Sequence, residues 1–175
     1  AISNRLVHMM DSEIELESEL GKGSTFGFHV TLEIAKEQYN TKNAKQESLN
    51  TEGKRILVVE DNDLNMEIIT TLLEDYKIIV EPVYNGKEAV DKVKASPPGY
   101  YDLVFMDIMM PVMDGKEAAR EIRKLPRKDC QELPIIAMSA NAFDEDVKQS
   151  LESGMNGHLS KPIDMRKLEE VLSQI

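Results

Sequence analysis

Charged and hydroxyl side chains follow four short apolar runs of the chain, each close to the point where the run ends. They are Glu60 and Asp61 after residues 55–59, Asp107 after 103–106, Ser139 after 135–138, and Lys161 shortly after 157–159. Short apolar runs bounded by polar residues are typical of buried strands. Because the ligands of an open parallel sheet bind beyond the carboxyl ends of its strands, we expect these side chains to converge there. The sequence therefore predicts one pocket that holds carboxylates, a hydroxyl and an ammonium group.

This set of side chains predicts a particular chemistry. Three carboxylates in one pocket repel one another, and a divalent cation removes that conflict. Few protein oxygens and an open crevice suit Mg²⁺ better than Ca²⁺, which prefers a fuller cage. We expect Glu60, Asp61 and Asp107 to hold the ion, which leaves Lys161 and the Ser139 hydroxyl for an anion. This arrangement favours phosphoryl transfer, with Asp107 as the acceptor.

Other interpretations use the same acidic residues. A single Asp after a strand is often a loop residue that turns the chain or caps a helix. The Asp61-Asn62-Asp63 run resembles the start of a haloacid-dehalogenase-type phosphatase, in which Asp61 would be the nucleophile, but Asn65 stands at that family's threonine position and there is no room for a cap domain. The same run imitates an EF-hand loop, yet the sixth and twelfth positions hold Met and Leu in place of the required Gly and Glu.

Strands and helices are predicted to alternate regularly from Lys54 to the end of the chain. The expected strands are 55–59, 78–83, 103–106, 135–138 and 157–159, and the expected helices are 64–75, 87–94, 116–124, 145–152 and 165–174. Five strand-helix units predict an α/β fold, a doubly wound parallel sheet covered by helices on both faces. The flavodoxin-like strand order 2-1-3-4-5 places the first and third strands side by side, so Glu60, Asp61 and Asp107 would meet.

The first 53 residues have a different pattern. Apolar residues at helical spacing predict a short helix over residues 1–10, and two alternating runs at 13–19 and 26–34 predict a hairpin with a glycine turn. Residues 37–53 are polar and without periodicity, as in a linker, and a flexible chain of that length spans roughly 20 to 25 Å. We therefore expect three parts: an N-terminal remnant (1–36), a linker (37–53) and the sheet domain (54–175).

Composition excludes several classes of function. The net charge is -11, with -4 on residues 1–53 and -7 on residues 54–175, so both parts would repel a nucleic acid backbone. Cys130 is the single cysteine, which allows no internal disulfide and favours a reducing, cytoplasmic location. No apolar run approaches the roughly 18 residues of a membrane span. The chain begins without methionine inside an amphipathic pattern, so we expect it to be part of a larger protein.

Residues 54–175 resemble a response-regulator receiver domain over their full length. The motifs that carry the resemblance are VEDN with Asn65, FMDIMMPVMDG, MSAN and GMNGHLSKPI. The resemblance implies that Asp107 accepts phosphate from a phosphohistidine. It also implies that Glu60, Asp61 and the backbone carbonyl of Met109 bind Mg²⁺.

The resemblance assigns further residues and exposes two departures. Ser139 and Lys161 would contact the phosphoryl oxygens, and the bond between Lys161 and Pro162 would be cis. Glu60 stands where many members of the family have Asp, and His158 stands at the switch position where Tyr or Phe is usual. In the family, phosphorylation draws the Ser139 position toward the phosphoryl group and lets the side chain at the His158 position turn inward.

The N-terminal segment resembles the end of a histidine-kinase ATP-binding domain, with GKGSTF as its last glycine box. The sequence boxes that bind magnesium and adenine in that family are absent, so we expect no ATP binding. Neither His8 nor His29 fits the family's phosphorylated histidine. Together the two resemblances imply a hybrid sensor histidine kinase as parent, with this chain as phosphoacceptor only. A histidine kinase or histidine phosphotransfer domain would be the partner. A membrane-associated parent and a dimer through the fourth-helix face are both compatible with this interpretation.

A competing class is a receiver-like interaction module that binds a partner without being phosphorylated. Retention of Glu60, Asp61, Asp107, Ser139 and Lys161 disfavours it. The chain ends one helix after Lys161, so we expect no DNA-binding output domain within it.

Overall fold

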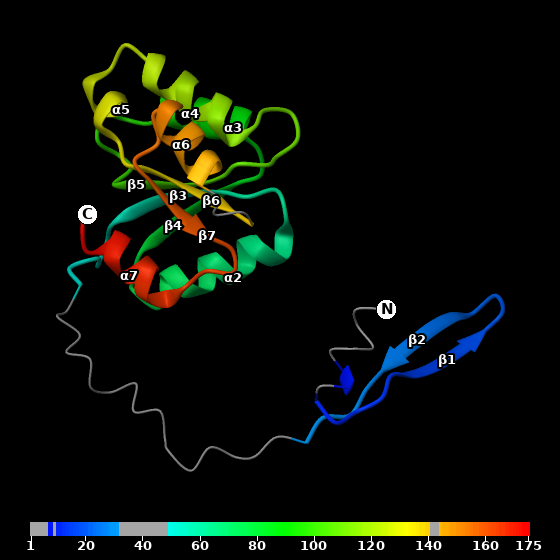
Figure 1. Ribbon diagram of the computed structural model, residues 1–175. Coiled ribbons are helices and arrows are strands. Elements are labelled where there is room, and N and C mark those ends of the chain that lie inside the picture. The colour runs from blue at the N-terminus through cyan, green and yellow to red at the C-terminus, as the bar shows by residue number, and fades with distance from the viewer. Residues whose placement is uncertain (1–6, 9, 32–48, 141–143) are drawn as a thin grey trace. The chain divides into compact units, whose positions relative to one another are not determined.

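The chain is described by a computed structural model (Figure 1), which covers residues 7–8, 10–31, 49–140 and 144–175. It divides into two compact units, Ala1–Lys45 and Gln46–Ile175. Of the helix expected over residues 1–10, Val7 and His8 are helical and Met10 lies in a turn, while the remainder is outside the described residues.

The first unit contains an antiparallel hairpin of β1 (Glu15–Glu19) and β2 (Gly23–Gly27). Its turn is short because Gly21 and Gly23 both adopt positive φ, which glycine does without steric cost. The second strand therefore starts earlier than the sequence predicted, at Gly23. Gly27 pairs with Glu15 at the far end of β1, and residues 28–31 are not in a strand. The remaining residues of the expected strand, 32–34, lie outside the described part of the chain.

The second unit is a five-stranded parallel sheet in the order β4-β3-β5-β6-β7. Its strands are β3 (Arg55–Val59), β4 (Ile79–Val83), β5 (Leu103–Asp107), β6 (Ile135–Ser139) and β7 (Gly157–Ser160). Numbered from the first strand of this unit, the order is 2-1-3-4-5, so the predicted flavodoxin-like topology is confirmed. Val59 pairs with Met106 across the two central strands, so Glu60 and Asp107 follow next to each other at the carboxyl edge.

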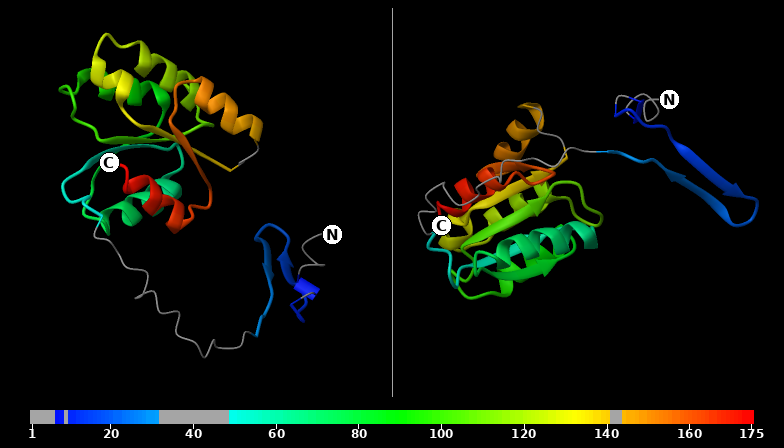
Figure 2. Two further views of the ribbon diagram at one scale, coloured as in Figure 1. Left: turned by 60° about the vertical axis from the view of Figure 1, so that its left-hand side comes forward. Right: turned by 90° about the horizontal axis from the view of Figure 1, so that it is seen from below.

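Helices cover both faces of the sheet (Figures 1 and 2). They are α2 (Asp63–Glu74), α3 (Gly86–Ala95), α4 (Gly115–Lys124), α5 (Lys128–Glu132), α6 (Asp144–Glu152) and α7 (Met165–Leu172). The helices α2 and α7 lie on one face, and the other four lie on the opposite face. The short helix α5 was not predicted, because its five residues contain a single buried side chain, Cys130, and therefore no apolar period.

Each face of the sheet has its own hydrophobic core. Along β3, Ile56 and Val58 pack with α2 and α7, whereas Leu57 and Val59 pack with α3 and α4. Strands buried on both faces read as continuous apolar runs, which is why RILVV and LVFM lack alternation. The two central strands are thus fixed from both sides, and they deliver Glu60 and Asp107 at a rigid edge.

Residues 49–53, at the end of the expected linker, contact the sheet unit. Thr51 is 2% exposed and its hydroxyl donates to the backbone carbonyl of Tyr76 at 2.8 Å. The N–H of Gly53 donates to the carbonyl of Lys77, and Leu49 packs against the core under α2 and α7. This segment therefore fastens the start of the sheet unit to the end of α2.

Replacing Thr51 with valine should destabilise the chain, because the carbonyl of Tyr76 loses its donor in a buried setting. We expect the free energy of unfolding to fall by about 1 to 3 kcal/mol. Urea unfolding followed by circular dichroism measures this. Thr71→Val is the matched control, because it removes an equally short hydroxyl-to-carbonyl bond on the exposed side of α2. An equal loss of stability in both variants would contradict a special role for the buried Thr51 hydrogen bond.

Candidate functional site

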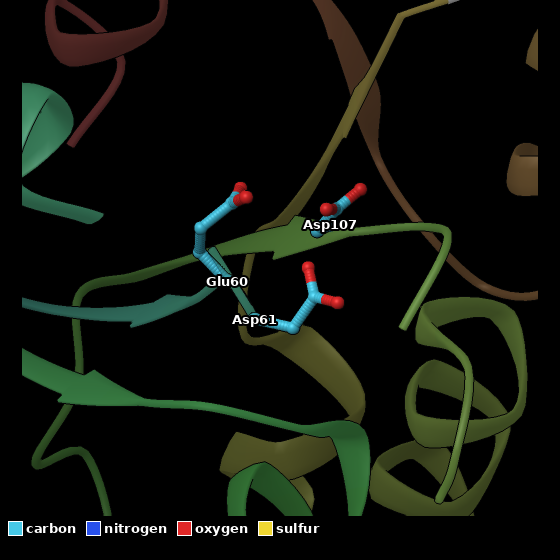
Figure 3. Close-up of side chains that lie close together, drawn as sticks. All are labelled: Glu60, Asp61 and Asp107. Carbon is cyan, nitrogen blue, oxygen red and sulfur yellow. The ribbon is translucent and has the colours of Figure 1, made fainter. Parts of the chain in front are cut away.

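Three carboxylates meet at the carboxyl edge of the two central strands (Figure 3). Glu60 and Asp61 follow β3 and Asp107 ends β5, and one oxygen from each lies within 4.8 Å of the other two. Glu60 is 1% exposed and Asp107 is 6% exposed, whereas Asp61 faces solvent. Carboxylate oxygens are hard ligands, and a partly open set of three leaves positions for water, as Mg²⁺ prefers. The donor set therefore fits the predicted magnesium ion.

Lys161 joins two of these acids. Its ammonium group donates to Oδ2 of Asp107 at 2.8 Å and to Oε2 of Glu60. Burial alone would lower the pKa of the Lys161 ammonium, but its hydrogen bonds with Asp107 and Glu60 and their negative charges outweigh burial and hold that pKa above its usual value. The bond between Lys161 and Pro162 is cis, as the resemblance implied. The hydrogen bonds therefore keep the lysine charged and direct its ammonium at Asp107.

Asn65 is a contact residue to which the sequence assigned no chemical role. Its side-chain amide donates to Oε1 of Glu60 at 2.8 Å. Asn62 caps α2 by accepting from the N–H of Asn65, which fixes the first turn of the helix over the end of β3. The signal was present in the spacing, because Asn65 is the third residue of a helix that begins just after the acidic pair.

Ser139 and His158 lie on neighbouring strands and contact each other. The Ser139 hydroxyl is 2.8 Å from Nε2 of His158, and which of the two donates depends on the histidine tautomer. Ser139 is the last residue of β6 and is 8% exposed, so its hydroxyl lies at the same edge as Asp107. The structure therefore links the two residues that the resemblance assigned to the switch.

The loop after Asp107 is hydrogen-bonded to the Asp107 carboxylate. The N–H of Met109 donates to Oδ1 of Asp107 at 3.3 Å, while the Met109 side chain is 79% exposed. The backbone of Met109 thus passes beside the acid, where the resemblance places a carbonyl ligand. Gly115 closes the loop, since its N–H donates to the carbonyl of Ile108. A Cβ at Gly115 would lie 2.1 Å from the Asp107 carbonyl oxygen, so only glycine lets α4 start there.

The fold and the site together define a receiver domain. Residues 56–173 match the response regulator receiver domain family, and the chain belongs to that family. Among its relatives is the autoinducer 2 sensor kinase/phosphatase LuxQ of Vibrio vulnificus, 36% identical over 173 residues, or 98% of this chain. The chain spans 20% of the length of that relative. The alignment extends well beyond the sheet unit into the N-terminal segment.

Two solved structures are similar to the sheet unit. The receiver domain of a sensor histidine kinase from Pseudomonas aeruginosa PAO1, with a magnesium ion coordinated in its active-site cleft, is 37% identical with a TM-score of 0.62. That alignment covers 70% of this chain and 96% of the other. The receiver domain of Ssk1, in complex with the histidine phosphotransfer protein Ypd1 of Saccharomyces cerevisiae, is 31% identical with a TM-score of 0.63, over 71% of this chain and 89% of the other.

None of the helices in the described part of the chain is both long enough and apolar enough to cross a bilayer.

Replacing Lys161 with methionine should destabilise the metal-free chain, because it removes the cation that two buried carboxylates share. We expect a loss of about 3 kcal/mol in the free energy of unfolding, which millimolar Mg²⁺ should partly restore. Because the pKa of Lys161 is raised on folding, its contribution is complete below the ordinary value of 10.5 and is lost as the pH rises through the folded value.

The difference between wild type and Lys161→Met should therefore shrink above about pH 10.5. Urea unfolding at pH 8 to 11.5 measures it. Lys167→Met, at an exposed position of α7, is the control and should show no such pH dependence. A constant difference up to pH 11.5 would count against the shared ion pair.

Proposed function

We propose that this chain is the phosphoacceptor of a phosphorelay and takes a phosphoryl group from phosphohistidine onto Asp107. The observation that carries the proposal is the meeting of Glu60, Asp61 and Asp107 within 4.8 Å beside the ammonium of Lys161. A magnesium ion held by the three carboxylates and the Met109 carbonyl would neutralise charge on the phosphoryl oxygens.

The transfer itself needs little covalent chemistry from the protein. A carboxylate oxygen of Asp107 attacks phosphorus, an O–P bond forms, the imidazole N–P bond breaks, and the imidazole leaves with the electron pair. Lys161 stays hydrogen-bonded to Glu60 while its ammonium turns from Asp107 to a phosphoryl oxygen. The Ser139 hydroxyl lies at the same edge of the sheet and contacts a second phosphoryl oxygen. Positioning and charge neutralisation supply most of the rate.

The proposed partner is a histidine kinase or a histidine phosphotransfer domain. Leu64 and Ile68 on α2 are 65% and 48% exposed, and Ile68 lines the same cavity as Glu60. A cavity of about 110 Å³ between α2 and residues 161–163 has walls of Ile68, Pro162 and Ile163. The complex of the similar Ssk1 receiver with Ypd1 supports a phosphotransfer domain as the partner. Apolar side chains beside Asp107 would bind the partner so that the donor phosphohistidine is aligned with the attacking oxygen of Asp107.

The parent is proposed to be a hybrid sensor histidine kinase, with residues 1–36 as the end of its ATP-binding domain and residues 37–53 as the linker. The alignment with LuxQ over 98% of this chain supports that order of parts. A cytoplasmic location for this part of the parent, and a dimer through the face of α6, the fourth long helix of the sheet unit, belong to the same proposal.

Replacing Asp107 with asparagine should abolish Mg²⁺-dependent labelling by acetyl phosphate or by a phosphorylated histidine domain. The amide cannot form the acyl phosphate and also removes one charge from the metal site. We expect at least a hundredfold less label by intact-protein mass spectrometry. Asp63→Asn, at an exposed position of α2, should be labelled as the wild type. Label on Asp61 would favour a dehalogenase-type phosphatase, and an unlabelled wild type would favour an interaction module.

His158 is proposed to act as the switch residue. It has less apolar ring area than Tyr or Phe, and an imidazole becomes charged when it takes up a proton, so turning the ring inward costs more once it is protonated. We expect beryllofluoride, a phosphoryl mimic, to shift the His158 ring resonances in NMR spectra at pH 8 and to shift them less at pH 5.5. Unchanged ring resonances at every pH would leave phosphoryl transfer as the only output.

A further inference from the structure

Glu60 is the most deeply buried of the three acids, and each of its carboxylate oxygens has a different partner. Oε1 accepts from the amide of Asn65 at 2.8 Å, and Oε2 accepts from the ammonium of Lys161. The residue is 1% exposed. Since each carboxylate oxygen has two lone pairs, both oxygens can still accept from water or bind a cation. The two partners therefore fix the plane of the carboxylate without closing it to a metal ion.

Asn65 and Lys161 are not equivalent as partners. Lys161 also binds Asp107, and in the proposed transfer it turns toward the phosphoryl group. Its ammonium therefore moves during the reaction, even though it keeps its hydrogen bond with Glu60. Asn65 has no charge, so it does not compete with the cation for the acidic pocket, and its contact with Glu60 persists while the lysine moves.

The helix places the Asn65 amide independently of Glu60. The N–H of Asn65 donates to the side chain of Asn62, and the N–H of Met66 donates to the Asn62 carbonyl, so the first turn of α2 is fixed by the cap. Side chains of a first turn lean back toward the helix start, which here directs the amide to the end of β3. The cap uses the backbone of residue 65, so truncating the side chain leaves the cap intact.

A glutamate at position 60 needs such a partner more than an aspartate would. Its side chain has one further methylene, about 1.5 Å of extra reach, and one further torsion to immobilise. Ile69 and Met138 line the same cavity and offer no hydrogen-bond donor. An aspartate in this place would end short of the Asn65 amide.

We propose that Asn65 is a positioning residue for the metal site: its amide fixes the carboxylate of Glu60 and so allows a glutamate to stand in the magnesium pocket. The inference rests on the proposed function, since it concerns how the pocket receives its cation. Asn65 need not touch the ion or the phosphoryl group.

A double-mutant cycle tests this in the full chain. The proteins are wild type, Asn65→Ala, Glu60→Asp and the variant with both changes, and Mg²⁺ affinity is measured by NMR titration of backbone amides. We expect Asn65→Ala to weaken Mg²⁺ binding about tenfold beside Glu60 and less than twofold in the Glu60→Asp background. Thermal unfolding of each protein is measured alongside, and Asn65→Leu, closer in shape to asparagine, replaces Asn65→Ala if the latter fails to fold.

The outcomes separate the possible failures. If Asn65→Ala weakens Mg²⁺ binding equally in both backgrounds, the residue acts on the fold and the inference is overturned. If Mg²⁺ affinity does not change beside Glu60, the inference is overturned as well, whatever happens to the unfolding temperature. If the wild type binds no Mg²⁺ at all, the proposed function itself fails.

Discussion

The receiver unit depends on holding two buried carboxylates next to each other. The pairing of Val59 with Met106 puts Glu60 and Asp107 at the same level of the sheet edge, where their charges repel. Lys161 compensates by donating to both, although it arrives from β7, two strands away from β5. One cation thus ties together three parts of the chain that are distant in sequence, and the ends of three strands are fixed relative to one another.

The same arrangement compensates the charge of the buried acids when no metal ion is bound. A carboxylate cluster that relied on Mg²⁺ alone would repel itself whenever the ion left. Here Lys161 supplies positive charge to the buried acids Glu60 and Asp107, whereas Asp61 is exposed and its charge is screened by water. The pocket is therefore stable without the ion yet keeps an oxygen-lined side toward water, which suits a cation that exchanges.

Most of the fold could be predicted because its signals are local. The three inner strands, β3, β5 and β6, are continuous apolar runs that end in a polar residue or just before one, and the strand order follows from five repeated units. The helix α5 could not be found, since five residues with Cys130 as the single buried side chain leave no period to detect. The second hairpin strand was placed too late because its start depends on which residues of β1 pair with it, and pairing is not visible in one strand alone.

The acidic residues and Lys161 could be found from the sequence, because parallel strands bring their carboxyl ends to one edge. The contacts between side chains could not. That Asn65 reaches Glu60, or that Ser139 meets His158, depends on side-chain directions and on the capping of α2, which spacing alone does not fix. Sequence patterns therefore identify the charged groups of this site, while the neutral groups that orient them emerge only from the packed structure.

The loop that follows Asp107 keeps its shape although one of its residues, Val112, adopts an unfavourable backbone conformation. Val112 has φ of 71° and is 83% exposed, and for a β-branched residue this left-handed conformation costs about 1 to 3 kcal/mol. Such a conformation persists only when its surroundings impose it. Gly115 fixes one end of the loop on Ile108, and the N–H of Gly86 fixes Met113 at 3.1 Å. These hydrogen bonds hold the loop on both sides of Val112, and the N–H of Met109 is kept beside the Asp107 carboxylate.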